Sequence, residues 1–163
     1  MGDYTGTNIL EKLGAFVPGY PGYAQREGRR KTDKILRLSI TRLLADQKPV
    51  LDAATQMLLK EKALDLVVAV DEVRRTLDLT ANKVRLAEYG NSGFFDLVQI
   101  KEQELDRLYS FDLSLKEMCE AIPGILAKLT SPETVEPTCR EACAQLQSIQ
   151  KAVAQRRAVM QEI

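Results

Sequence analysis

The stretch LRLSITRLLADQKPVLDAATQM, residues 36–57, decides the fold. Its apolar residues recur every three to four positions, which is the period of one face of an α-helix. They are Leu36, Ile40, Leu43, Val50, Ala54 and Met57, and Gln47 stands at the one polar step. Because the phase survives Pro49, we expect one long helix over 24–60, kinked or locally broken at that proline. The alternative is that Pro49 lies in the first turn of a new helix.

Three further stripes of the same period follow along the chain. The second, over 63–89, is followed by Gly90, which suits the position just past a helix C-terminus. The third, over 97–122, is closed by Pro123 and Gly124, and a connector over 130–137 leads to the fourth. The stripe residues are Ala63, Leu66, Val70, Val73, Leu77, Thr80, Val84 and Ala87, then Val98, Leu105, Leu108, Asp112, Leu115, Cys119 and Ile122, then Cys139, Ala142, Leu146, Ile149, Val153, Arg157 and Met160.

No segment alternates with a period of two, so strands are not expected and the fold class is all-α. Long helices joined by short connections pack antiparallel. We therefore expect an up-down bundle of three long helices plus a fourth, with coiled-coil-like packing. Residues 1–22 form an N-terminal arm and an aromatic loop, and residues 23–163 form a single bundle domain. The short helix expected over 7–14 has three possible docking places: its own bundle, another copy or a partner's groove.

The composition limits the chemistry. The chain has 163 residues, no histidine, 23 Lys plus Arg and 23 Asp plus Glu. Without histidine, the commonest general base and metal ligand is missing. Zero net charge gives no general attraction for nucleic acid. The charges are unevenly spread, since segment 24–45 holds seven basic and two acidic residues, whereas segment 96–120 holds seven acidic and three basic ones. We expect these two helices to be complementary neighbours.

Two loops collect six of the nine aromatic residues, over 16–23 and 89–96. If successive helices alternate in direction, both loops lie at the same pole of the bundle. One interpretation is that the aromatic rings plug the open end while the arginines stack on them and pair with Asp96, Glu102 and Asp106. The other is that the pole is a recognition surface, because rigid aromatic and Arg side chains make interface hot spots. The candidate partner-binding residues are Tyr20, Tyr23, Arg26, Arg29, Arg30, Phe94 and Phe95.

Three motifs carry a resemblance to known proteins. They are PGYPGY (residues 18–23) running into an Arg-rich helix, YGNSGFFD (89–96) and LDRLYSFD (105–112). Together, over about residues 16–122, the chain resembles a group of uncharacterised bacterial all-helical proteins. The resemblance implies the fold class and brings no activity, cofactor or catalytic residue with it.

The remaining motifs speak against catalysis. Cys119, Cys139 and Cys143 are an odd number of thiols, which favours reduced core cysteines over disulfides or a metal site. The chain shows no nucleophile motif and no phosphate-binding loop. We expect no enzyme activity, no catalytic residue, no metal and no cofactor. The sequence also has no signal peptide and no apolar run of membrane-spanning length, so we expect a cytoplasmic protein.

The function expected from the sequence is protein–protein interaction through the pole, as an adaptor, assembly subunit or regulator. The partner is another protein or a second copy in a homo-oligomer, and no small-molecule substrate is evident. The alternative is nucleic-acid binding by the first helix, where basic residues are spaced by four, four and three. They are Arg26, Arg30, Lys34 and Arg37. An enzyme or ligand-binding bundle of unrecognised type is the third hypothesis.

Overall fold

The computed structural model describes residues 6–87 and 93–163, and within them the chain is helical without a strand. The prediction of an all-α fold is confirmed. The helices are α1 (Gly6–Phe16), α2 (Arg29–Ala45), α3 (Lys48–Lys60), α4 (Val67–Arg85), α5 (Glu102–Leu126) and α6 (Pro132–Glu162). Short 3₁₀ turns lie at Arg26–Gly28, Leu64–Leu66 and Gly93–Asp96.

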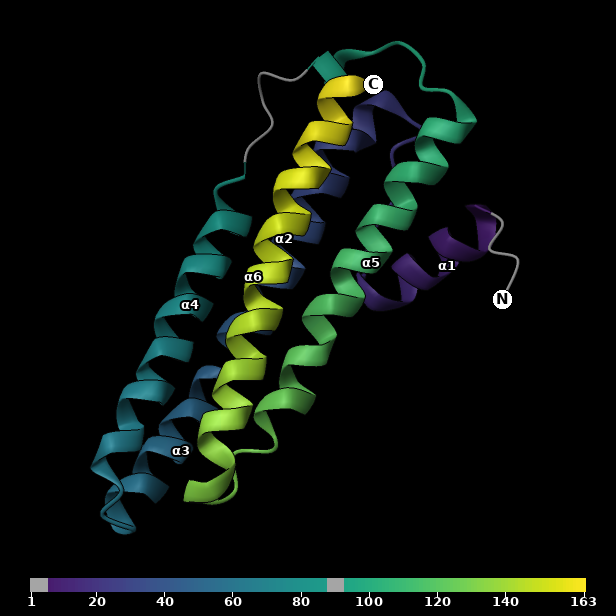
Figure 1. Ribbon diagram of the computed structural model, residues 1–163. Helices are drawn as coiled ribbons and strands as arrows, with labels where there is room; N and C mark the ends of the chain where they lie inside the picture. The colour runs from purple at the N-terminus through teal and green to yellow at the C-terminus, as the bar shows by residue number, and fades with distance from the viewer. Residues whose placement is uncertain (1–5, 88–92) are drawn as a thin grey trace.

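Four long helices, α2, α4, α5 and α6, run side by side (Figure 1). Helix α2 packs against α4 and α5, and α6 packs against the same two helices, so the ring order is α2, α4, α6, α5. Neighbours α5 and α6 are antiparallel, since Gln145 bonds to Met118 and Glu162 pairs with Arg107. Neighbours α4 and α6 are parallel, since Cys143 contacts Thr76 while Gln150 contacts Thr80. The expected up-down bundle of three long helices plus a fourth is not confirmed in this form, because neighbours α4 and α6 run parallel.

The first long helix is divided in two. Helix α2 ends at Ala45 and α3 begins at Lys48, with Pro49 in its first turn, so the alternative interpretation of Pro49 is the one confirmed. A proline in a first turn lacks only an N–H that has no partner inside the helix. The buried face continues through the break and differs from the predicted stripe by one residue at three positions. The fully buried leucines are Leu44, Leu51 and Leu58, while the predicted Leu43, Val50 and Met57 are half-buried.

The last two helices are longer and begin elsewhere than expected. Helix α5 starts at Glu102, after an exposed Val98, and continues through Pro123 to Leu126. Helix α6 already begins at Pro132 and runs through Pro137. Pro123 was expected to close the third helix, and the connector over 130–137 was expected to end with a proline in a first helical turn, where Pro132 lies. Apolar packing on both sides of Pro123 and of Pro137 outweighs the lost hydrogen bond. Gly90, the expected end of the second helix, lies outside the described residues, and α4 ends at Arg85.

The N-terminal helix α1 packs against α5 of its own chain (Figure 1). Ile9, Leu13 and Val17 are buried and belong to the same hydrophobic core as the long helices. Of the three docking places expected for this segment, its own bundle is the one observed. The division into an arm over 1–22 and a domain over 23–163 stays a prediction.

Candidate functional site

The two aromatic loops meet at one pole of the bundle, as expected. The ring of Tyr23 stacks on Tyr109 at 5.8 Å between centroids and lies edge-on to Phe94 at 5.7 Å and to Tyr20 at 6.0 Å. Phe95 in turn lies edge-on to Phe94 at 5.3 Å. Such pairs add roughly 0.5–1.5 kcal/mol each beyond the area that they bury. We call these five residues the aromatic cluster.

Gly22 and Arg29 fix the first loop in place. Gly22 has φ of +81°, and a Cβ there would lie 2.7 Å from the Tyr109 hydroxyl, so only glycine fits. Arg29 is fully buried and donates from Nε to the Tyr23 carbonyl at 2.9 Å. Its Nη1 donates to the carbonyls of Phe94 at 3.2 Å and Leu97 at 2.6 Å. The guanidinium thus clamps the two loops together.

Directly beneath the aromatic cluster lies an ionic network that no solvent reaches. Arg156 is 1% exposed and donates to Asp112 at 2.6 Å and to Asp33 at 2.7 Å. The hydroxyls of Tyr20 and Tyr23 donate to the other Asp112 oxygen at 2.7 and 2.6 Å. We call these five residues the buried ionic network. It ties the first loop to α2, α5 and α6.

The surroundings of the buried ionic network keep its tyrosines protonated. Burial raises the pKa of Tyr20 and of Tyr23 well above the usual value, and the neighbouring Asp112 carboxylate raises them further. For Tyr23, Arg156 acts in the opposite direction. A cavity beside Arg37 and Arg156 measures about 10 Å³, roughly the space that one water molecule needs. The network therefore has no room for a substrate and serves to hold the pole together.

Sequence reasoning missed the central residue of this network. The predicted stripe of the last helix ran from Val153 to Arg157, whereas Arg156 is buried and Arg157 is exposed. A signal was present in the third stripe, because Asp112 occupies a core position among leucines. A buried carboxylate needs a cation or several donors nearby. Because the sequence contains many arginines, it does not identify the one that pairs with Asp112.

Five of the seven predicted partner-binding residues are buried. Tyr20, Tyr23, Arg29, Phe94 and Phe95 are each 7% exposed or less. Arg26 and Arg30 are exposed. Arg30 lies 4.9 Å above the Phe95 ring and 3.6 Å from Asp96, as the plug interpretation expects. Among the described residues, the expected ion pairs to Glu102 and Asp106 are not formed. The burial of the rings favours the plug interpretation over a surface that a partner could reach.

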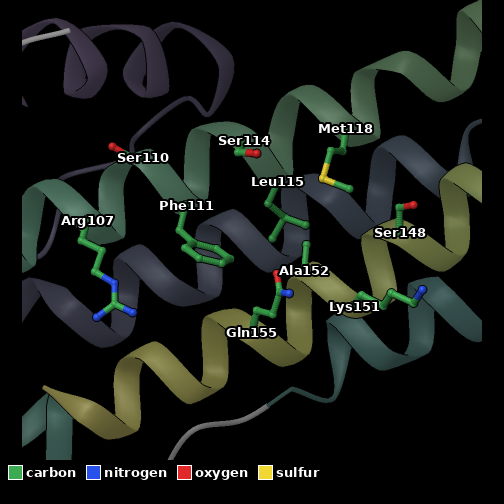
Figure 2. Close-up of a pocket in the computed structure, with 10 residues that line it drawn as sticks. All are labelled: Arg107, Ser110, Phe111, Ser114, Leu115, Met118, Ser148, Lys151, Ala152 and Gln155. Carbon is green, nitrogen blue, oxygen red and sulfur yellow. The ribbon is translucent and has the colours of Figure 1, made fainter.

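An apolar groove lies between α5 and α6 (Figure 2). It measures about 540 Å³. Phe111, Leu115 and Met118 of α5 face Ala152 of α6 across it. Its polar residues are Ser110, Ser114, Ser148 and Gln155, and its charged residues are Arg107 and Lys151. No acidic residue lines the groove. We call it the α5–α6 groove.

Cys119 and Cys139 are buried, and Cys143 is half-buried. Burial raises the pKa of Cys119 to about 12 and that of Cys139 to about 11, so both stay protonated at neutral pH. Cys143 contacts the Thr76 hydroxyl at 3.9 Å. Across residues 6–87 and 93–163, no group of three or more Cys, Asp or Glu is placed to hold a metal ion. The cysteines of this part of the chain pack as small apolar residues.

The described helices include none with the length and apolar character required to cross a bilayer. The structure offers two candidate sites: the aromatic cluster with its arginines, and the α5–α6 groove. Comparison of the chain with protein-family models, with curated proteins and with solved structures gave no match.

Proposed function

We propose that this protein is a non-enzymatic helical module that binds another protein, and that the α5–α6 groove receives one helix of that partner. The partner helix is amphipathic and carries acidic residues beside its apolar face. The observation that supports this most is that the two charged residues among those that line this apolar groove, Arg107 and Lys151, are both cations. Binding of an amphipathic helix in an apolar groove is a recurrent mode of protein recognition.

The dimensions suit a helix. The groove follows α5 from Arg107 to Met118, which corresponds to about 17 Å or three helical turns. The small side chains along it, Ser110, Ser114, Ser148 and Ala152, allow a third helix to approach the two bundle helices closely. Phe111 and Met118 supply apolar surface that is only half-buried in the free protein. Covering this surface is the main source of binding energy.

The charges select the partner's polar face. Arg107 lies on the α5 side and Lys151 on the α6 side, so a bound helix has a cation on each flank. Both side chains are exposed, and Arg107 forms an ion pair with Glu162 in which Nη1 lies 3.3 Å from Oε2. Rim charges of this kind steer association and reject the wrong partner more than they add affinity. An acidic helix is thereby preferred over a basic one.

The proposal assigns the pole a supporting role. Its aromatic rings hold the two loops together, and Arg26 and Arg30 are the predicted pole residues that a partner can reach. Catalysis finds no support, because the buried carboxylates and tyrosines are fully engaged with one another and the chain has no histidine. A cytoplasmic location stays a prediction from the sequence.

The test uses designed helical peptides of about 14 residues, three to four turns. One carries Glu beside its apolar face, and the other carries Lys at the same places. We expect the acidic peptide to bind at least about tenfold more tightly. Lys151→Glu should reverse or abolish this preference. The matched control is Arg157→Glu, an exposed α6 residue outside the groove. Equal binding of both peptides, or no binding by either, contradicts the proposal.

Nucleic-acid binding is the second candidate, and the exposure of Arg26, Arg30 and Lys34 favours it. The fourth predicted residue, Arg37, instead pairs with Asp33 at 2.9 Å and donates to the Arg85 carbonyl. Three exposed cations give a weak, salt-dependent interaction at most. Absence of binding to mixed DNA and RNA at low ionic strength removes this candidate.

A further inference from the structure

Helix α4 carries an uncovered apolar stripe on the outside of the bundle. Its exposed residues recur with spacings of four and three: Val68, Glu72, Arg75, Leu79, Asn82 and Leu86. Val68 is 66% exposed, Leu79 51% and Leu86 67%, and Leu64 in the preceding turn is 61% exposed. These four are half of the eight large exposed hydrophobic residues in the described part of the chain. We call this surface the outer stripe of α4.

The bundle already occupies both flanks of this stripe. On one flank, Arg74 pairs with Asp52 at 2.7 Å and Asp78 with Lys48 at 2.8 Å, both on α3. On the other flank, Thr80 and Lys83 bond to Gln150 of α6. In Figure 1, α4 forms one edge of the molecule. The outer stripe faces away from the bundle, and no other described helix is available to cover it.

We propose that the outer stripe of α4 binds the same stripe of a second copy, with the two helices antiparallel. A two-fold axis that passes between Val73 and Arg74 sets the register. Val68 then lies opposite Leu79 of the second copy, and Leu79 opposite its Val68. Glu72 lies opposite Arg75 in the same way. The 4-3 spacing is the one that allows two helices to stay in contact over several turns.

The charges favour this self-pairing over the alternatives. None of the ion pairs formed among the described residues involves Glu72 or Arg75, and both side chains are exposed, so both can pair with a second copy. The antiparallel register matches each with an opposite charge, whereas a parallel pair would set Glu72 against Glu72 and Arg75 against Arg75. The same register brings Leu86 within about one turn of Leu64 of the second copy. One sequence thus supplies both complementary surfaces, which is the property of a symmetric dimer.

The interface is small. From Leu64 to Leu86 the contact is about 33 Å long, and a single helix pair of this length lies at the low end of specific interfaces. We therefore expect a reversible dimer with a dissociation constant in the micromolar range. The α5–α6 groove involves other helices, so this proposal and the proposed function can fail independently.

The first test measures the mass of the protein in solution by sedimentation equilibrium across the micromolar range. We expect a monomer–dimer equilibrium, and Leu79→Arg should shift it to monomer. Leu38→Arg is the matched control, because Leu38 of α2 is also 51% exposed. Circular dichroism confirms that both variants stay folded. A wild-type monomer throughout the range, or equal dissociation by both variants, overturns the proposal.

The second test reverses the charges. Glu72→Arg alone and Arg75→Glu alone should each weaken the dimer at least about tenfold, because like charges then face each other. The double variant E72R/R75E should recover wild-type dimerisation, and a mixture of the two single variants should form heterodimers. If neither single substitution changes the dissociation constant of the dimer, the dimer uses another surface and the proposal is overturned. If the double variant dimerises more weakly than both single variants, the antiparallel register is excluded.

Discussion

Arg156 and Arg157 are adjacent in the chain, but Arg156 is buried and Arg157 is exposed. Arg156 bonds to two buried carboxylates and to the Tyr23 hydroxyl. A buried charge whose partner is removed has neither water nor a counter-ion around it. The fold of the pole therefore depends on Arg156 in a way that the arginine content alone could not indicate.

Substitution of this pair gives a direct prediction. Arg156→Met keeps an unbranched apolar stem but removes the guanidinium, which leaves Asp33 and Asp112 without their shared cation. We therefore expect the unfolding free energy to fall by about 3–5 kcal/mol. Arg157→Met should change it by less than about 0.5 kcal/mol. Urea unfolding followed by circular dichroism measures both. Equal effects of the two substitutions would show that Arg156 is not the centre of a buried network.

The buried tyrosines and thiols predict loss of stability in alkali. Burial raises the pKa of Tyr20, Tyr23, Cys119 and Cys139 in the folded protein. The unfolded chain releases these protons at about pH 8.5 for thiols and about pH 10 for tyrosines, while the folded protein still holds them. The contribution of these four groups to the unfolding free energy should therefore be constant below about pH 8 and fall progressively above it. Tyr20→Phe should reduce the slope above about pH 10, and an unchanged slope would contradict the assignment.

At the scale of helices, the hydrophobic period was more informative than the prolines. The stripes of α4 and of the first part of α6 are buried as predicted, for example at Val73, Leu77 and Leu146. Helix ends were not predictable, because a proline is compatible both with a first turn, as at Pro49, and with a helix interior, as at Pro123. Tertiary packing decides between them, and a single sequence does not display it.

These two prolines give a prediction at the same scale. Pro123→Ala restores an N–H that can bond within α5, so we expect a gain of about 1–3 kcal/mol in unfolding free energy. Pro49→Ala removes no strain and loosens the unfolded chain, so we expect a loss of less than about 1 kcal/mol. Thermal unfolding compares the two variants. A loss of stability in Pro123→Ala would show that α5 gains from its proline.

At the scale of the whole molecule, the sequence predicted the meeting of the two aromatic loops, and the structure places them together. It could not predict the ring order of the helices, because the phase of a stripe says which face is buried and not which neighbour covers it. The α5–α6 groove and the outer stripe of α4 are two surfaces that the bundle leaves uncovered. Neither contains a residue of the aromatic cluster.

The central claim is that a partner helix binds in the α5–α6 groove. Methyl-labelled methionine reports on it most directly by NMR, because Met118 lines the groove, Met57 lies on α3 and Met160 is buried. The acidic designed peptide should shift the Met118 signal in a saturable way and leave Met57 unchanged. A Met118 signal that does not move while the peptide binds would place the partner elsewhere and contradict the account.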